Sequence, residues 1–270
     1  MPELPEVERG RQQAEDACVG KTIKKVFTSK DEIVYAGVTH TTFARTLKGR
    51  TVQAARRRGK QLWLELDGDG PQPLIHFGMT GSFRAYTDPD ERPRFCKFEL
   101  HLSDGSYFAF KNSRRLGRIK LRQDPLHEDP IANLGPDPYL EPPTAAEFRR
   151  MVKGKRAIMK SLLMNQSFLA GVGNWIADEI LYQAKVSPHR RSDDLTDAEI
   201  NRVRTRLLAI VDKAVDAGAD YKKFPKAWLF HRRWDIRESR KDAVLDTKGQ
   251  PIQFDKIGGR TTAWVPAVQS

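Results

Sequence analysis

The chain has 270 residues, and 47 Lys and Arg against 35 Asp and Glu give it a formal net charge of +12. This excess favours polyanionic partners such as nucleic acids, although ribosomal and membrane-surface proteins are equally basic. Its two cysteines, Cys18 and Cys96, exclude a disulfide framework and a Cys-x-x-Cys zinc site, and no apolar run is long enough for a transmembrane helix. A chain of this length has room for two domains.

The first half of the sequence is dominated by strand patterns. Residues 3–17 are its one helical segment, with a weak apolar stripe at Val7, Ala14 and Cys18. Alternating apolar residues then predict strands in several short runs, and Asp104-Gly105 supplies hairpin turn chemistry between two of them. The residues that alternate are Leu62, Leu64 and Leu66, then Phe98, Leu100 and Leu102, and then Phe108 and Phe110. These runs predict an antiparallel β-sandwich.

The second half changes to a helical period after a boundary at residues 132–143, where prolines and a glycine interrupt any regular element. Capping boxes begin at Thr144 and Thr196, and an apolar stripe over residues 200–215 predicts an amphipathic helix that Gly218 ends. The pattern returns to strand around residues 246–254.

The start of the chain, MPELPEVERG, has no apolar stretch and does not resemble a signal peptide. Processing that removes Met1 is expected to leave Pro2 with a free secondary amine, whose pKa of about 7.7–8.0 keeps part of it unprotonated near neutral pH. Such an amine can attack an aldehyde-like sugar carbon and form an iminium, and the adjacent Glu3 can act as acid or base. The alternative is that Pro2 is simply a common residue after an initiator methionine.

MPELPEVE, followed by GKTI, resembles the start of the formamidopyrimidine-DNA glycosylase and endonuclease VIII family. The resemblance implies that Pro2 is the nucleophile and that Glu3 is essential to catalysis. Further segments match the family in order, so the likeness covers almost the whole chain.

Three of these segments lie in the first half. RRRGKQLWLEL implies that Lys60 approaches the phosphate beside the lesion and assists elimination, and LIHFGMTGSF implies that His76 contacts phosphate and that Met79 inserts into the duplex. NSRRLG resembles the family's void-filling loop, in which Arg114 pairs with the orphaned base and Leu116 stands where the family often has phenylalanine. Without the resemblance, the sequence favours a solvated charge at Lys60 and a core residue at Met79.

The second half contains two further matches. Residues 163–190 are similar to the family's helix–two-turn–helix, which implies that Asn174 binds phosphate and that Lys155 upstream contacts DNA. GGRTTAWVPAVQ resembles the end of the family's hairpin finger, in which Arg260 grips the phosphates beside the lesion. Bacterial members build this finger around four zinc-binding cysteines, which this chain lacks, and WLFHRRW resembles the zincless finger of plant and fungal relatives. His231 is therefore expected to be structural rather than a metal ligand.

The expected fold is α+β. An N-terminal antiparallel β-sandwich domain with its helix (residues 1–131) is followed by a linker (132–143), a helix–two-turn–helix domain (144–234) and a zincless β-hairpin finger (235–270). DNA is expected to bind in a basic cleft between the domains. We expect a monomer with no metal or organic cofactor and no membrane partner, located in the nucleus, or in the cytoplasm or nucleoid if the source is prokaryotic.

The function implied by the resemblance is that of a bifunctional DNA glycosylase and abasic-site lyase of base excision repair acting on damaged double-stranded DNA. The iminium at Pro2 would support β- and δ-elimination. Because the chain is short between Tyr221 and Trp228, where bacterial members carry a longer loop over the everted base, formamidopyrimidines, hydantoins and abasic sites are expected as better substrates than 8-oxoguanine. The competing hypotheses are a non-catalytic nucleic-acid-binding module, as in ribosomal and topoisomerase proteins, and a damage sensor without turnover.

Overall fold

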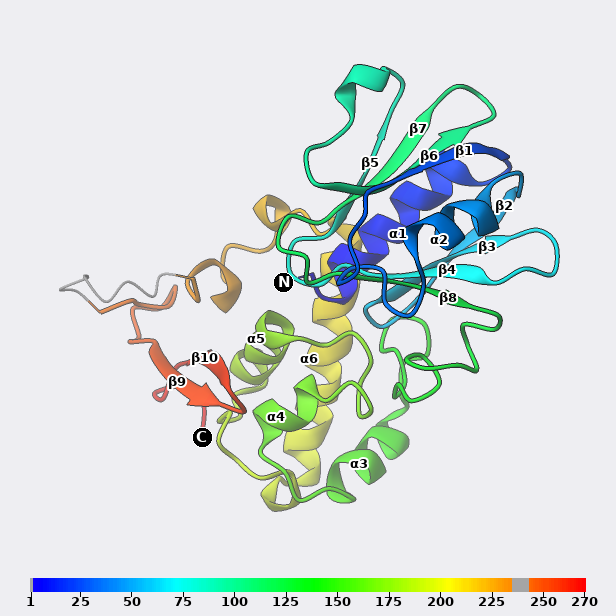
Figure 1. The fold of residues 1–270 in the computed structure, drawn as a ribbon. Coiled ribbons are helices and arrows are strands. Elements are labelled where there is room, and N and C mark those ends of the chain that lie inside the picture. The colour runs from blue at the N-terminus through cyan, green and yellow to red at the C-terminus, as the bar shows by residue number, and fades with distance from the viewer. Residues whose placement is uncertain (1, 235–242) are drawn as a thin grey trace. The chain divides into compact units, whose positions relative to one another are not determined.

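The computed structural model describes residues 2–234 and 243–270, so Met1 and the expected start of the finger at 235–242 lie outside the described residues. Its contacts divide the chain into two units, unit 1 (Met1–Asn133) and unit 2 (Leu134–Ser270). Each unit has its own elements, which Figure 1 labels in chain order.

Unit 1 contains two four-stranded sheets in which neighbouring strands are antiparallel (Figure 1). The first sheet has the order β1 (Ile23–Thr28), β6 (Cys96–Leu102), β7 (Tyr107–Lys111) and β5 (Ser82–Tyr86). The second has the order β2 (Val52–Arg58), β3 (Gln61–Leu66), β4 (Gln72–His76) and β8 (Arg118–Arg122). The hairpin turn expected at Asp104-Gly105 is present between β6 and β7, where Gly105 has a φ of +85°.

The core of unit 1 is aromatic, because inward-facing phenylalanines from β5, β6 and β7 pack together with the helix α1 (Leu4–Cys18). Val7, Ala14 and Cys18 of α1 are all buried, so the weak stripe in the sequence marks its inner face. A second helix, α2 (His40–Leu47), was not expected. It buries only Phe43 and Leu47, too few apolar residues to establish a helical period.

Unit 2 is helical at its centre, with α3 (Ala145–Lys153), α4 (Met159–Met164), α5 (Asn174–Ala184) and α6 (Asp197–Asp216), and a 3₁₀ turn (Ser192–Asp194) lies between α5 and α6. The predicted capping boxes are present at the starts of α3 and α6. The amphipathic stripe becomes the buried face of α6, and Gly218 follows its C-terminus with a φ of +61°. The segment after Asn133 packs on this unit, since Gly135 N–H donates to the Gln166 carbonyl and Ala170 N–H to the Pro136 carbonyl.

Unit 2 ends in an antiparallel hairpin of β9 (Gln253–Ile257) and β10 (Arg260–Trp264). The strand expected around residues 246–254 was placed too early. The side chain of Asp246 accepts hydrogen bonds from the backbone N–H groups of Lys248 and Gln250, which folds that stretch into a turn. With sheets in unit 1 and helices in unit 2, the predicted α+β class is confirmed.

Candidate active site and nucleic-acid interface

The first residues of the chain are fixed at the start of α1. Glu3 is the N-cap residue and only 2% exposed, and its backbone N–H donates to Glu6 Oε2 at 2.9 Å. Pro2, one residue earlier, is partly exposed. A partly exposed imino acid therefore stands directly before a buried carboxylate on a rigid helix end.

Glu6 is a residue that the sequence analysis overlooked. Burial, followed by the nearby charge of Glu3, raises the pKa of Glu6 from 4.5 to about 7. A carboxyl group that exchanges its proton near neutral pH is suited to acid–base work. Its position one helical turn after Glu3 was readable in PELPE, but its protonation depends on burial, which the sequence does not display.

Lys60 occupies a two-residue turn with Gly59, because Arg58 pairs with Gln61 across β2 and β3. The turn is tied to the first helix by Arg57, whose side chain is fully buried. Arg57 donates to Glu8 Oε2 of α1 at 2.9 Å and to the Gly59 carbonyl at 3.0 Å. This buried ion pair links the helix that carries Glu3 to the turn that carries Lys60.

His76 lies in register with Gln61 on β3 and with Arg118 on β8. Burial, with the charges of Lys60, Arg118 and Lys120, lowers the pKa of His76 to about 4. Because Gly78 N–H donates to His76 Nδ1 at 3.2 Å, the proton of the neutral ring is on Nε2. His76 can therefore donate one hydrogen bond to an anion without carrying charge.

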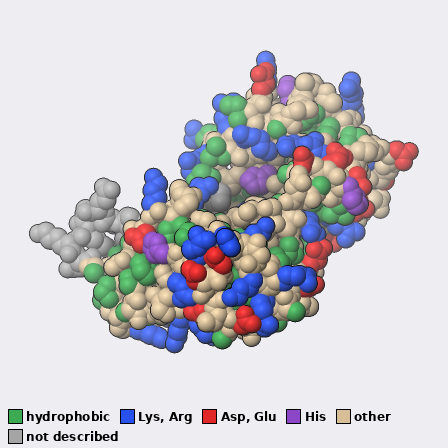
Figure 2. Space-filling view, turned by 90° about the horizontal axis from the view of Figure 1, so that it is seen from below, with side chains coloured by type: hydrophobic (Ala, Val, Ile, Leu, Met, Phe, Trp, Pro, Cys, Tyr) green, Lys and Arg blue, Asp and Glu red, His purple; other side chains and the backbone are tan. Residues whose placement is uncertain are grey.

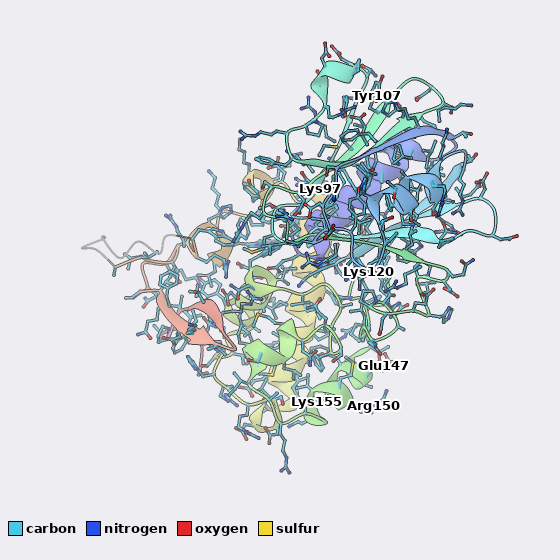
Figure 3. The ribbon with its side chains drawn as sticks, viewed as in Figure 1. Lys97, Tyr107, Lys120, Glu147, Arg150 and Lys155 are labelled. Carbon is cyan, nitrogen blue, oxygen red and sulfur yellow. The ribbon has the colours of Figure 1, made fainter. Side chains whose placement is uncertain are left out.

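A small cationic pocket of about 190 Å³ lies beside this histidine. Its lining includes Gln61, His76, Arg118 and Lys120, and Figure 3 labels Lys120 on β8. Arg118 and Lys120 were missed in the sequence, although RIKLR alternates basic and apolar residues and so places both cations on one face of β8. The pocket has the size and charge to accept a phosphate group.

Two loops of unit 1 present the residues expected to enter the duplex. Met79 is 39% exposed and Leu116 is 41% exposed. The loops touch, because Arg114 N–H donates to Thr80 Oγ1 and a Cβ on Gly78 (φ +63°) would lie 2.3 Å from the Leu116 carbonyl carbon. Only glycine permits this approach, and it brings the Met79 and Leu116 loops together.

In unit 2 the start of α5 lies against the hairpin. Asn174 Nδ2 donates to the Thr261 carbonyl at 2.8 Å, while Asn174 Oδ1 is buried without a hydrogen-bond partner. Arg260, the neighbour of Thr261, is exposed and directly follows the Gly258-Gly259 turn. The structure therefore brings Asn174 and the Arg260 strand together, where the unpaired N–H groups of a helix start favour an anion.

Lys155 is exposed in the segment that follows α3, on the part of unit 2 that also carries Glu147 and Arg150 (Figure 3). Its carbonyl accepts a hydrogen bond from Ser192. No hydrogen bond or ion pair among the described residues joins Lys155 to Asn174 or Arg260.

Charge alone does not locate a binding surface. Figure 2 shows Lys and Arg side chains distributed among acidic ones over the face seen from below. No group of three or more His, Cys, Asp or Glu side chains within the described ranges is arranged to hold a metal ion. Both cysteines are buried in unit 1, and His231 bonds to the Phe224 carbonyl. None of the helices described is long and apolar enough to cross a membrane.

Unit 1 therefore carries a partly exposed chain start beside acidic residues and a cationic pocket, and unit 2 carries a helix start joined to an arginine-bearing hairpin, features that favour an enzyme acting on nucleic acid. Comparison with known proteins agrees. The model of the formamidopyrimidine-DNA glycosylase N-terminal domain matches residues 1–119, and that of the formamidopyrimidine-DNA glycosylase H2TH domain matches residues 134–225.

Individual relatives match along the whole chain. A formamidopyrimidine-DNA glycosylase of Arabidopsis thaliana is 39% identical over all of this chain and 71% of its own length. One from Pelobacter propionicus is 30% identical over all of both proteins. The Lactococcus lactis enzyme bound non-covalently to DNA containing an abasic site superimposes with a TM-score of 0.85, 25% identity and 99% coverage of both chains. The chain therefore belongs to the formamidopyrimidine-DNA glycosylase family, which places it among the DNA glycosylases of base excision repair.

Proposed function

We propose that this protein is a bifunctional glycosylase and abasic-site lyase that acts on oxidised bases in double-stranded DNA, with Pro2 as its nucleophile. The observation that carries the proposal is the placement of Pro2 directly before the buried N-cap Glu3. The turn that holds Lys60 is tied to the same helix through Arg57 and Glu8. This arrangement gathers a nucleophile, an acid–base group and a cation in one unit.

The chemistry follows from a free Pro2 nitrogen. The nitrogen bonds to C1′ of the damaged nucleoside, the C1′–base bond breaks, and the base leaves with a proton. Glu3 protonates the ring oxygen, so that the opened sugar is held as an iminium. Loss of a C2′ proton then expels the 3′ phosphate, and a second elimination expels the 5′ phosphate. Water hydrolyses the iminium and regenerates the Pro2 amine.

The remaining residues have binding roles in this proposal. Lys60 and Arg260 stabilise the phosphates that leave, and His76 donates its Nε2 proton to a phosphate oxygen. Met79 and Leu116 fill the space left by the everted nucleotide, and their exposure supports this role. Arg114 pairs with the orphaned base, Asn174 binds backbone phosphate, and Lys155 contacts the DNA.

The proposed substrates are formamidopyrimidines, hydantoins and abasic sites, with weak activity on 8-oxoguanine. The segment between Tyr221 and Trp228 is compact, because Phe224 and Trp228 are buried and stack near Trp175. It supplies no long loop to cover an everted purine. Structural neighbours with TM-scores of 0.84 and 0.86 include Lactococcus lactis enzymes complexed with DNA containing FAPY-dG and an oxidised pyrimidine, respectively.

The hairpin of β9 and β10 is proposed to act as a zincless finger. Side-chain hydrogen bonds join its strands and support this proposal, because Asp255 of β9 accepts from Trp264 Nε1 of β10 and bonds to the His189 ring. The monomeric state, the domain limits inferred from the sequence and the nuclear location stay predictions.

Borohydride reduction of the reacting complex on abasic duplex DNA tests the proposal. Wild-type protein should become covalently trapped, and Pro2→Gly or an N-terminal extension should reduce trapping at least about 100-fold, since either change weakens or blocks the amine. Pro89→Gly is the matched control, because Pro89 also begins a helical turn beside an acidic residue but lies on an exposed surface. Equal trapping by Pro2→Gly, the extended protein and wild type would leave a binding module or sensor as the better account.

A further inference from the structure

Asp31 is a buried carboxylate in the segment that follows β1, and no step of the proposed chemistry uses it. It is 5% exposed and accepts a hydrogen bond from Lys97 Nζ of β6 at 2.7 Å (Lys97 is labelled in Figure 3). It also accepts two hydrogen bonds from Arg115, from Nε at 3.0 Å and from Nη2 at 3.1 Å. The backbone N–H groups of Ile33 and Val34 complete its partners, so the carboxylate is rigidly held.

Arg115 has an unusual backbone conformation. Its φ is +55°, in the left-handed region that residues with a side chain rarely adopt, and about half of its side chain is exposed. Such a conformation persists only where surrounding contacts hold it. The bidentate pair with Asp31, 84 positions away in the chain, holds the Arg115 side chain, and the Arg115 carbonyl accepts a hydrogen bond from Arg118 Nη1 at 3.2 Å.

The strained residue separates two side chains of its own loop that are expected to contact the bases of the DNA. Arg114 and Leu116 flank Arg115, and both are exposed. The base of the same loop is fixed by Asn112, which donates to the Phe77 carbonyl and accepts from Gly117 N–H. Asp31 thus anchors the tip of a loop whose base is held independently.

We propose that Asp31 is a positioning residue for recognition of the base opposite the lesion. By fixing Arg115 in its left-handed conformation, it directs Arg114 outward, and by neutralising the Arg115 guanidinium it removes a second cation that would compete for the same base. Specificity then depends on a preorganised donor fork rather than on a mobile loop. This inference rests on the proposed pairing of Arg114 with the orphaned base.

The state of Asp31 fits this role. Burial raises its pKa, but hydrogen bonds from Arg115 and Lys97 outweigh burial and lower the pKa to about 2. Asp31 is therefore ionised at every pH at which DNA binding is measured. Asp31→Asn keeps the shape of the side chain and removes the charge that holds Arg115.

The test measures binding rather than cleavage, using duplexes that carry a tetrahydrofuran abasic analogue opposite cytosine or adenine. We expect a marked ratio of the two Kd values for wild type, and at least a five-fold fall of that ratio toward unity in Asp31→Asn. Arg114→Ala should lower it equally, and the double variant should be no worse than Arg114→Ala alone, because both changes remove one function. Asp31→Glu should retain more of the preference than Asp31→Asn.

Two further variants keep the result interpretable. Asp104→Asn removes the partner of Lys21 on an exposed turn of the same unit and should leave the Kd ratio unchanged. Arg115→Gly permits a φ of +55° without strain but deletes the guanidinium, so it should lose the preference while keeping its melting temperature. If Asp31→Asn does not fold, Arg115→Gly tests the same loss of the Asp31–Arg115 pair.

A wild-type ratio near unity, an unchanged ratio in Asp31→Asn or Arg115→Gly, or independent losses in the double variant would each overturn the inference. None of these results would contradict the role of Pro2 as the nucleophile. Failure of wild-type borohydride trapping would instead refute the proposed function while leaving the binding data valid.

Discussion

The two units present an exposed arginine to solvent in different ways. In unit 1, Arg114 projects from a loop whose strained tip is held by the buried Asp31, and the Arg115 side chain that Asp31 binds is half exposed. In unit 2, Arg260 follows two glycines, and the hairpin behind it is anchored on Asp178, which is buried. The comparison predicts that loss of the Asp31–Arg115 pair, in which the arginine is half exposed, costs less stability than loss of the fully buried pairs of Asp178.

The Asp178 centre links four parts of unit 2. Asp178 on α5 pairs with Lys160 of α4 and with Arg233, and it accepts a hydrogen bond from Ala263 N–H of β10 at 3.1 Å. Lys160 and Arg233 are buried as well. Because Lys160 also donates to the Asn174 carbonyl, the hairpin and the start of α5 share one ionic support.

Of the predicted changes, removal of the Asp178 centre should have the largest effect on stability. Asp178→Ala removes the carboxylate that two buried cations bind and should lower the free energy of unfolding by about 3–5 kcal/mol. Tryptophan fluorescence during urea unfolding is the measurement, since four of the five tryptophans lie in unit 2. Asp193→Ala, which removes the partly exposed pair with Arg191, should cost less than about 1 kcal/mol. Equal losses in Asp178→Ala and Asp193→Ala would show that the buried Asp178 centre contributes no more to stability than a partly exposed ion pair.

The second prediction concerns unit 1, where Glu6 is an acidic group whose pKa is raised by burial. A carboxyl whose folded pKa is about 7 binds its proton more tightly in the folded state. The contribution of Glu6 protonation to the free energy of unfolding is therefore fully present below about pH 4.5, and it is lost as the pH rises toward 7. Glu6→Gln mimics the protonated form and should exceed wild type by about 2–3 kcal/mol at pH 8, and match it near pH 4. A difference that does not change with pH would refute the raised pKa.

Loss of Arg260 in unit 2 should weaken DNA binding without changing the preference for the base opposite the lesion. Arg260→Ala should raise Kd for abasic-analogue duplex about ten-fold and reduce the salt slope by about one, because one phosphate contact is lost. Arg114→Ala should change the opposite-base ratio and leave the salt slope nearly constant. Lys48→Ala removes an exposed charge at the end of α2 and controls for net charge. An Arg260 variant with an unchanged slope would argue against phosphate contact.

The smallest effect concerns Phe95, a second left-handed residue in unit 1, with a φ of +62° and no buried ion to hold it. Its ring is 48% exposed and stacks with Arg94 at 4.7 Å. Phe95→Gly relieves the strain and should stabilise unit 1 by up to about 1 kcal/mol. Phe95→Ala loses the same ring without relief and should destabilise it. Thermal melting of both variants decides the matter, and the opposite order would show that the ring is the stabilising part.

Sequence patterns predicted those parts of the fold that depend on local chemistry. The Asp104-Gly105 turn, the capping boxes at Thr144 and Thr196, and the stripe on α6 all depend on residues a few positions apart, and all are present. The strand expected around residues 246–254 failed because the Asp246 side chain competes for backbone N–H groups. Helix α2 was missed because its apolar face has only two residues.

The candidate site also combines residues that local motifs predict with properties that depend on the fold. Pro2, Glu3, Lys60 and the loop residues were readable from motifs. The proton on Glu6, the neutral state of His76 and the pair of Asp31 with Arg115 depend on burial and on residues distant in the chain. Such properties arise only when the fold brings the groups together.

Peptide mapping of the borohydride-trapped complex tests the central claim most directly. After digestion of the DNA and protein, the peptide spanning residues 2–9 should carry the reduced sugar remnant on the Pro2 nitrogen, and Met1 should be absent. A remnant on a lysine such as Lys60, or full incision of abasic duplex by protein that is blocked at its first residue, would contradict the account.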